Sequence, residues 1–161
     1  MNSSDKGSFA EEWYRAIFSP NSSTHVRLSG ASGMTRFPDL VDIHGSLQDI
    51  KHIEGALSQR ELDQFGDYVD MIGTRMSVEI NGTPQTVQVQ TVRYAFLNPD
   101  GVSANAAWMH RNLRAGVAFE IFNQQGDRLI VNSVGVFRPD GTQFANLDFL
   151  IYSTQLNAWL R

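Results

Sequence analysis

The stretch that decides the fold is INGTPQTVQVQTVRYAFL, residues 80–97. Asn81-Gly82 is the strongest short signal for a β-hairpin, because a type I′ turn needs positive φ at both central residues. Pairing Ile80 with Thr83 fixes the register of the two strands. This register gathers five alternating apolar residues on one face: Met76, Val78, Ile80, Val87 and Val89. The sequence therefore predicts a hairpin centred on residues 81–82.

The apolar positions change sides within the same stretch. Apolar residues occupy odd-numbered positions up to Val89 and even-numbered positions from Val92 onward. Side chains on a regular strand cannot switch faces, so a bulge near Gln90-Thr91 is needed to restore one apolar face. Because bulges bend strands, we expect one long, curved strand here.

Two capping boxes predict two helices. Residues 8–11 and 58–61 each place a serine three residues before a glutamate, the pattern that satisfies the free amides at a helix start. In the first helix Phe9, Trp13 and Ile17 recur every four residues, which predicts a docked apolar face. Truncating Trp13 to alanine is then expected to cost about 3 kcal/mol or more, as for a core residue. The second helix ends at Gly73 and carries an apolar stripe: Leu62, Phe65, Val69 and Ile72.

The remaining elements are shorter. Residues 25–28 and 40–44 are strand candidates separated by a glycine-containing loop, and residues 98–101 (NPDG) predict a turn. A helix capped by Ser103 is expected to follow and to end before Gly116. Three strands, at residues 117–123, 128–137 and 144–152, then predict a β-meander. The C-terminal residues 154–161 predict a helical turn that docks three apolar side chains: Leu156, Trp159 and Leu160.

These elements predict an α+β fold. We expect a curved, mainly antiparallel sheet of five to seven strands, built from the long bulged hairpin and the C-terminal meander, with two to three helices packed on one face. A chain of 161 residues can bury a single core. We therefore expect one domain over residues 1–161, with residues 1–7 as a flexible tail.

Composition narrows the class of partner. The chain is 42% hydrophobic and 19% charged, near the norm for globular proteins, and its formal net charge is −4. That charge argues against nucleic acid, because binding to phosphates requires clustered Lys and Arg. The basic residues are 11 Arg and 2 Lys, and Arg is favoured where directional pairing at protein interfaces matters. The absence of cysteine excludes disulfides and thiolate chemistry.

The N-terminus gives an expectation about location. It shows no basic region followed by a continuous apolar segment, and no run approaches the ~18 apolar residues of a membrane span. The sequence therefore predicts no signal peptide and no membrane segment. We expect a protein of the cytoplasm, or of a particle assembled there.

The densest group of titratable residues surrounds Asp42 and His44. On a strand these two side chains point the same way, so the carboxylate would orient the imidazole for general-base catalysis or for half of a metal site. The alternative is that residues 42–55 (DIHGSLQDIKHIEG) form an ordinary solvated segment. No HExxH, His-x-His or EF-hand pattern accompanies them, so neither a metal nor a cofactor is predicted.

Two further groups are interface candidates. Gln88 and Gln90 lie on the polar face of the predicted hairpin, which is either solvent-facing or a hydrogen-bonding face for another subunit. Trp108, Arg111 and Arg114 share a short segment expected to be helical. That segment has three interpretations: a structural helix, a protein interface anchored by Trp and Arg, or a nucleic-acid contact.

The sequence favours a non-enzymatic structural or assembly protein. It would act by self-association or by docking into a larger complex of the virion, tail-like or secretion type, with itself or other protein subunits as partners. One alternative is a small curved-sheet enzyme or ligand-binding domain with an apolar pocket and the Asp42–His44 acid-base pair. A second is an acidic regulatory or immunity-type module that covers a basic surface of its partner.

Overall fold

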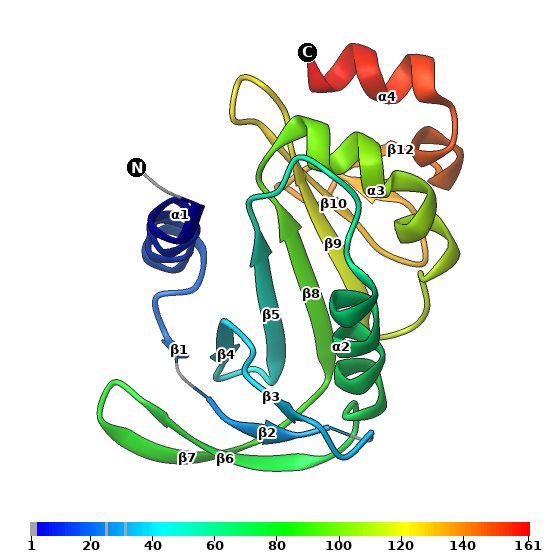
Figure 1. The fold of residues 1–161 in the computed structure, drawn as a ribbon. Helices are drawn as coiled ribbons and strands as arrows, with labels where there is room; N and C mark the ends of the chain where they lie inside the picture. Colours follow the sequence, from blue (N-terminus) through cyan, green and yellow to red (C-terminus); the bar gives the residue numbers. More distant parts are fainter. Residues whose placement is uncertain (1–2, 25, 31) are drawn as a thin grey trace. The chain divides into compact units, whose positions relative to one another are not determined.

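In this computed structural model the chain is described over residues 3–24, 26–30 and 32–161. Four α-helices, twelve strands and one 3-10 helix lie in these ranges (Figure 1). Their bounds are α1 (Ser3–Phe18), β1 (Ser22–Ser23), β2 (Leu28–Ser29), β3 (Thr35–Arg36), β4 (Leu40–Asp42), β5 (Ser46–Lys51), α2 (Gln59–Asp70), β6 (Arg75–Ile80), β7 (Thr83–Gln88), β8 (Thr91–Phe96), α3 (Pro99–Arg111), β9 (Val117–Phe122), β10 (Arg128–Val131), β11 (Val136–Phe137), β12 (Gln143–Ala145), η1 (Leu147–Leu150) and α4 (Ser153–Leu160).

The chain divides into two compact units. The first comprises Met1–Ile50 and Ser58–Arg93, and the second comprises Lys51–Leu57 and Tyr94–Arg161. This division does not test the expectation of one domain over residues 1–161, which stays a prediction.

The α+β class and the antiparallel pairing are confirmed. Eight strands form an open sheet in the order β1-β4-β5-β8-β9-β10-β11-β12, while β2–β3 and β6–β7 form separate two-stranded ladders. The expected numbers were wrong: the sheet has eight strands rather than five to seven, and the described residues hold four α-helices rather than two to three. Strands of two or three residues, such as β1 and β11, are too short to show alternation in a sequence.

The hairpin of the first unit has the predicted register. Asn81 and Gly82 both have positive φ, 52° and 79°, and Ile80 pairs with Thr83. Val78, Ile80, Val87 and Val89 are buried, which places the apolar alternation on the inner face. The hairpin is nevertheless a ladder of its own (Figure 1), so the expectation that it belongs to the main sheet was wrong.

The apolar residues change from one face of the strand to the other near Gln90-Thr91, where the sequence predicts it. The Gly45 carbonyl accepts hydrogen bonds from the amides of both Gln90 (2.8 Å) and Thr91 (3.3 Å), so two residues oppose one, as in a β-bulge. Val89 before the bulge and Val92 after it are both fully buried. The bulge is therefore confirmed, but one continuous strand was wrong, because the chain is divided there into β7 and β8.

Helix α2 begins as predicted. The Ser58 hydroxyl accepts from the Glu61 amide (3.3 Å) and the Glu61 carboxylate accepts from the Ser58 amide (3.2 Å), which completes the capping box. The buried face differs from the predicted stripe, because Phe65 and Tyr68 are buried while Leu62, Val69 and Ile72 are half-buried. A tyrosine at the centre of the buried face interrupts the simple apolar pattern.

Strand β5 was missed. The alternative of a solvated segment over residues 42–55 was wrong for Ser46 to Ile50, all of which are buried. Gln48 accepts from the Ser19 hydroxyl (3.1 Å) and donates to the Asp42 carboxylate (3.0 Å), while Asp49 accepts from the Asp39 amide (3.1 Å). Polar side chains satisfied in this way let a buried strand resemble a solvated segment in sequence.

In the second unit, α3 begins earlier than predicted. The Asn98 side chain accepts from the Asp100 amide (2.8 Å), and Pro99 occupies the first helical position. The turn expected at residues 98–101 and the cap expected at Ser103 were therefore wrong. The buried Asn105 of α3 holds the preceding segment, accepting from the Leu57 amide (2.9 Å) and donating to the Gly55 carbonyl (3.0 Å).

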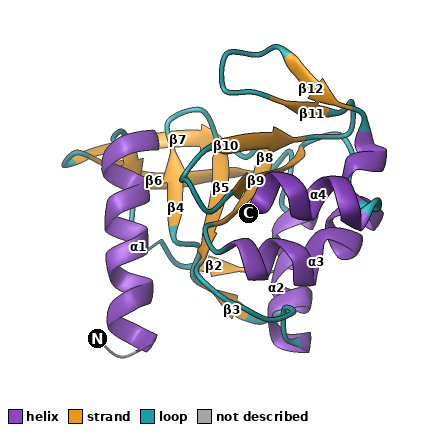
Figure 2. Ribbon diagram, turned by 90° about the horizontal axis from the view of Figure 1, so that it is seen from above, coloured by secondary structure: helices purple, strands orange, loops and turns teal. Residues whose placement is uncertain are grey.

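The C-terminal meander is shorter than predicted. Strands β9 to β12 pair in sequence as antiparallel neighbours. The strand expected over residues 128–137 is divided by a turn in which the Asn132 side chain accepts from the amides of Val134 (2.8 Å) and Gly135 (3.2 Å). The strand expected over residues 144–152 was wrong beyond Ala145, where the chain forms η1 and then α4. Helix α4 packs on α3 and η1 (Figure 2). Of the three side chains predicted to dock, Leu156 and Leu160 are buried and Trp159 is half-buried.

Candidate functional site

The structure uses the Asp42 carboxylate to build a turn. Its Oδ1 accepts from the amides of His44 (2.9 Å) and Ser46 (3.0 Å), and its Oδ2 accepts from the Gln48 side chain (3.0 Å). His44 is exposed. Asp42 therefore binds the backbone of His44, and the acid-base role proposed for the pair stays a prediction without support from this geometry.

The interface candidates of the hairpin are exposed. Gln88 and Gln90 both lie at the surface, and the Gln88 side chain donates to the Gly73 carbonyl at 3.3 Å. Ser77, Glu79 and Thr86 are exposed as well. A polar exposed face of this kind fits solvent as well as a partner, so its interface role stays a prediction.

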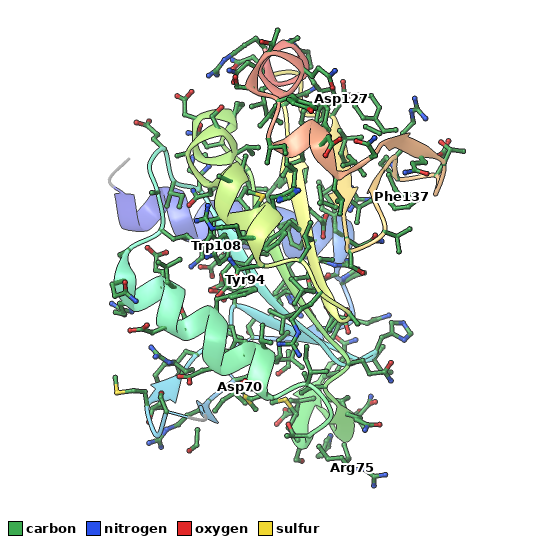
Figure 3. The ribbon with its side chains drawn as sticks, turned by 90° about the vertical axis from the view of Figure 1, so that its right-hand side faces the viewer. Asp70, Arg75, Tyr94, Trp108, Asp127 and Phe137 are labelled. Atoms are coloured by element: carbon green, nitrogen blue, oxygen red, sulfur yellow. The ribbon has the colours of Figure 1, made fainter. Side chains whose placement is uncertain are left out.

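Trp108 belongs to an aromatic cluster of the second unit. Its ring centroid lies 6.4 Å from that of Tyr94 (Figure 3). The ring centroid of Phe119 lies 5.4 Å from that of Trp108. Trp108 is half-buried, whereas Arg111 and Arg114 are exposed. The geometry places Trp108 in a packed cluster, as the structural interpretation of this segment predicts. The interface role proposed for Trp108, Arg111 and Arg114 stays a prediction.

The first unit contains a surface that the sequence interpretation placed in the core. Helix α1 begins at Ser3 rather than at Ser8, and its buried face contains Ala10 and Tyr14. Its outer face consists of three large apolar side chains with exposed fractions of 62% (Phe9), 39% (Trp13) and 54% (Ile17). The expectation that these three residues form the docked face was wrong.

A second signal in the sequence could have identified the buried face. Ala10, Tyr14 and Phe18 also recur every four residues, so α1 carries two apolar faces side by side. Phe18 joins them, because its ring lies 5.1 Å from Tyr14 and 5.7 Å edge-on from Trp13. Tertiary packing decides which of the two faces is buried, and in this structure it is the face with Tyr14.

The stability of Trp13 variants should reflect this exposure. We expect Trp13→Ala to lower the free energy of unfolding by about 2 kcal/mol, because 39% of this residue is already exposed and only part of the transfer energy of a buried tryptophan is lost. Its fully buried neighbour provides the matched control, since Tyr14→Ala is expected to cost about 3–5 kcal/mol. Urea denaturation followed by circular dichroism measures both. Equal losses for the two variants would mean that Trp13 is covered in solution.

An acidic cleft adjoins the same helix. It has a volume of about 670 Å³ and lies between α1 and the segment that leads into β4. Its lining includes Glu11, Glu12, Arg15, Ala16, Phe37 and Asp39. Phe37 is 58% exposed, and the described residues of the lining add three carboxylates and one guanidinium to its aromatic ring.

The partners of two lining residues orient the charges of the acidic cleft. Arg15 donates from Nη2 to the Ser22 carbonyl (3.1 Å), which turns part of its guanidinium toward β1. Asp39 accepts from the Ile50 amide at 2.7 Å. Both side chains therefore bind backbone groups of the first unit.

Buried polar groups on α2 have structural partners. Desolvation raises the pKa of the buried Tyr68 hydroxyl well above its usual range, and the nearby Asp49 charge adds to the effect. Gln64 donates to that hydroxyl at 2.7 Å, and the buried Asp67 carboxylate pairs with Arg36 at 2.7 Å. A tyrosine held neutral and a carboxylate paired with an arginine are typical of a structural polar core.

Within the residues that the structure describes, no three His, Asp or Glu side chains lie together in a way that would hold a metal ion. No helix in the same ranges is long and apolar enough to cross a membrane. Comparison of the chain with protein-family models, with curated proteins and with solved structures found no match.

Proposed function

We propose that this protein acts by binding other protein subunits through the outer face of α1. The observation that carries the proposal is the exposed row of Phe9, Trp13 and Ile17 on a helix whose neighbouring apolar face is already packed. Large apolar side chains grouped on one exposed face are characteristic of protein interaction sites, because leaving them in water is unfavourable. Aromatic anchors such as Phe9 and Trp13 are also enriched in the energetic centres of interfaces.

The proposal agrees with the non-enzymatic, assembly role that the sequence favours. Membership of a virion, tail-like or secretion-type complex is part of the same proposal. The Asp42 carboxylate, on which the enzyme alternative depends, is used by the turn at residues 42–46. A docking role requires only the outer face of α1 and a subunit that covers it.

A matched pair of variants tests this role. Phe9→Ser with Ile17→Ser removes the two most exposed anchors of the outer face, and Met34→Ser removes an equally exposed apolar side chain elsewhere in the first unit. Native mass and light scattering, across concentration and salt, are compared for the purified proteins, together with the proteins that co-purify from the source cells. We expect an association that the double variant loses and Met34→Ser retains.

The contrary result is well defined. Two results together would show that the outer face of α1 binds no subunit. The wild type, the double variant and Met34→Ser would all be monomers when purified, and all three would co-purify with the same proteins from the cells. We expect each variant to fold, because exposed residues contribute little to stability. Circular dichroism and the urea midpoint check this.

A further inference from the structure

We propose that Asn81 is a site of spontaneous deamidation, in which its side-chain amide is converted to a carboxylate by reaction with the backbone of the same chain. The site is the turn between β6 and β7, away from the outer face of α1, and it does not depend on the proposed docking function. The attacking group and the leaving group both belong to residues 81–82, and the remaining reactant is water.

The reaction has two steps. The backbone nitrogen of Gly82 loses its proton to hydroxide and attacks Cγ of Asn81, so that a C–N bond forms. The bond from Cγ to Nδ2 breaks, and Nδ2 takes a proton from water and leaves as ammonia. Water then adds to one of the two carbonyl carbons of the five-membered succinimide ring and opens it. Opening at one carbon gives aspartate, and opening at the other gives isoaspartate, whose backbone runs through the former side chain.

The sequence favours this reaction at one asparagine. The attacking nitrogen belongs to the following residue, and a glycine there has no side chain to obstruct the ring and leaves the backbone free to rotate. The chain contains 10 Asn, and Asn81 is the one that glycine follows. No described heavy atom lies within 4 Å of the position that a Cβ of Gly82 would occupy, so the ring has room to form.

The position of the turn gives the reaction a short path from the folded state. Asn81 and Gly82 are both exposed and form the tip of a ladder whose last pair is Ile80–Thr83 (Figure 1). To bring the Gly82 nitrogen to Cγ the backbone has to rotate at Asn81, which opens this last pair. The end of a two-stranded ladder opens at a lower free energy than the ladder as a whole. The reaction therefore needs only a local opening.

One contact of the first unit opposes the reaction. Nδ2 of Asn81 donates to Oδ1 of Asn21 at 3.2 Å, and Asn21 lies between α1 and β1. This hydrogen bond holds the amide that has to turn toward the Gly82 nitrogen, and Nδ2 is also the atom that leaves. Both asparagines are exposed, so the bond competes with water. We therefore expect Asn21 to slow the reaction rather than to prevent it.

Two other sequences that could form the same ring are protected. Aspartate before glycine can also give a succinimide, with loss of water, and the chain has this pattern at residues 100–101 and 140–141. Gly101 is buried in α3, where a Cβ would clash with the Ile53 carbonyl oxygen, so the backbone has no room to rotate. The Thr142 hydroxyl (2.7 Å) and amide (2.9 Å) donate to Asp140 and hold the pKa of its carboxyl below the usual value. A carboxylate that stays ionised is a poor target for a nucleophile.

The product changes the hairpin as well as its charge. Aspartate at position 81 carries a negative charge and has no amide hydrogen to donate to Asn21, so the hydrogen bond between the two side chains is lost. Isoaspartate adds a carbon atom to the backbone of a turn whose two residues have φ values of 52° and 79°, as a type I′ hairpin requires. The extra atom disturbs the register that buries Ile80 and Val87 on one face. We expect the first unit to lose stability as isoaspartate accumulates.

Ageing of the full chain tests the proposal. The purified protein is kept at physiological temperature at neutral and at mildly alkaline pH, and peptide mapping by mass spectrometry follows the conversion of each asparagine. Electron-transfer fragmentation distinguishes isoaspartate from aspartate. We expect Asn81 to convert first and to give both products. Its rate should rise in proportion to the hydroxide concentration, because the attacking nitrogen has to be deprotonated.

Two variants at the turn test the chemistry. Asn81→Gln lengthens the side chain by one carbon, so the five-membered ring cannot form, and we expect conversion at position 81 to fall below detection. Gly82→Ala should slow the conversion at least tenfold, because a methyl group obstructs the attacking nitrogen. The same variant is less stable, since alanine is strained at positive φ. A looser turn alone would make the reaction faster, so a slower reaction identifies the Gly82 nitrogen as the attacking group.

A further pair of variants tests the role of Asn21. Asn21→Ala removes the hydrogen bond to Nδ2, and the conversion of Asn81 should then become several-fold faster. Thr24→Ala, an exposed residue of the same connecting segment, provides the control and should leave the rate unchanged. Equal rates in the wild type and Asn21→Ala would overturn the role assigned to Asn21.

Two results would overturn the proposal itself. Conversion of Asn81 in urea but not in the folded chain over the same period would show that the turn keeps the Gly82 nitrogen away from Cγ. Faster conversion of another asparagine in the folded chain would show that the following glycine does not decide the site. Neither result changes the association measured for the outer face of α1, so the docking function is tested separately.

Discussion

Replacing Gly45 with alanine is expected to lower the free energy of unfolding by about 4 kcal/mol, one of the largest effects of a single substitution in this chain. Gly45 has φ +79°, and a Cβ at this position would lie 1.8 Å from the Gln88 carbonyl oxygen. Backbone cannot move aside as the end of a side chain can. The same residue accepts the amides of Gln90 and Thr91, so its displacement also disturbs the bulge.

Gly82 separates the two causes of that loss, which are the positive φ and the close approach of the Gln88 carbonyl oxygen. It has the same φ of +79°, but nothing lies within 4 Å of the position that its Cβ would occupy. Gly82→Ala should therefore show only the cost of a left-handed conformation, about 1–2 kcal/mol. Urea denaturation of the two variants measures the difference. Similar losses would mean that the Gly45 backbone relaxes away from Gln88 and that the bulge is not held as described.

The contrast between these two glycines shows what local sequence can predict. Asn81-Gly82 and the Ser58 capping box are specified by residues two to three positions apart, and both were predicted correctly. The requirement at Gly45 comes from a strand that lies more than forty residues further along the chain. No pattern within residues 42–47 reveals that position 45 requires glycine. The change of parity near Gln90 predicts a bulge, but it does not identify the residue on the neighbouring strand that lies opposite.

Helix α1 and strand β5 show why the rest could not be predicted. Both faces of α1 have apolar residues at four-residue spacing, so periodicity alone cannot choose between Trp13 and Tyr14 as the buried residue. In β5, Gln48 and Asp49 are buried because distant groups satisfy them, which local composition cannot show. Tertiary contacts decide both cases.

The candidate site was missed for the same reason. The sequence interpretation named the right residues of α1 but assigned them to the core, and it sought chemistry at Asp42 and His44, where the structure builds a turn. Glu12 and Phe37 come together in one cleft although they lie far apart in the chain. An exposed apolar face is a property of packing, so it can be identified only once the competing face has been buried.

Removing the carboxylate of Asp67 is expected to cost about 3–5 kcal/mol, because it leaves a buried guanidinium without its counter-charge. Arg36 and Asp67 are 6% and 5% exposed, and their Nε–Oδ2 distance is 2.7 Å. The Ser32 amide (3.0 Å) and hydroxyl (2.7 Å) also donate to this carboxylate. Asp67→Ala would therefore detach α2 from the β2–β3 ladder, and the urea midpoint should fall accordingly.

A double variant distinguishes the cost of the broken pair from the value of the intact pair. Replacing both partners, Arg36→Met with Asp67→Leu, leaves no buried charge, and such replacements are often neutral or stabilising. We expect the double variant to recover most of the stability that Asp67→Ala loses. A double variant as unstable as the single one would show that the hydrogen bonds from Ser32, rather than the ion pair, hold α2 in place.

The pair also predicts how stability depends on pH. Burial alone would raise the pKa of Asp67, but the hydrogen bonds from Ser32 and the interaction with Arg36 outweigh it and hold the pKa below its usual value. A carboxyl whose pKa is lower in the folded state binds fewer protons there than in the unfolded state. Its contribution is therefore complete at pH values above the ordinary pKa of about 4 and is lost as the pH falls below it. Urea midpoints measured from neutral to acid pH should fall more steeply below that value for the wild type than for Asp67→Asn, whose side chain carries no titrating proton. Parallel curves for the two proteins would show that Asp67 is not the carboxylate that acid must protonate to loosen the first unit.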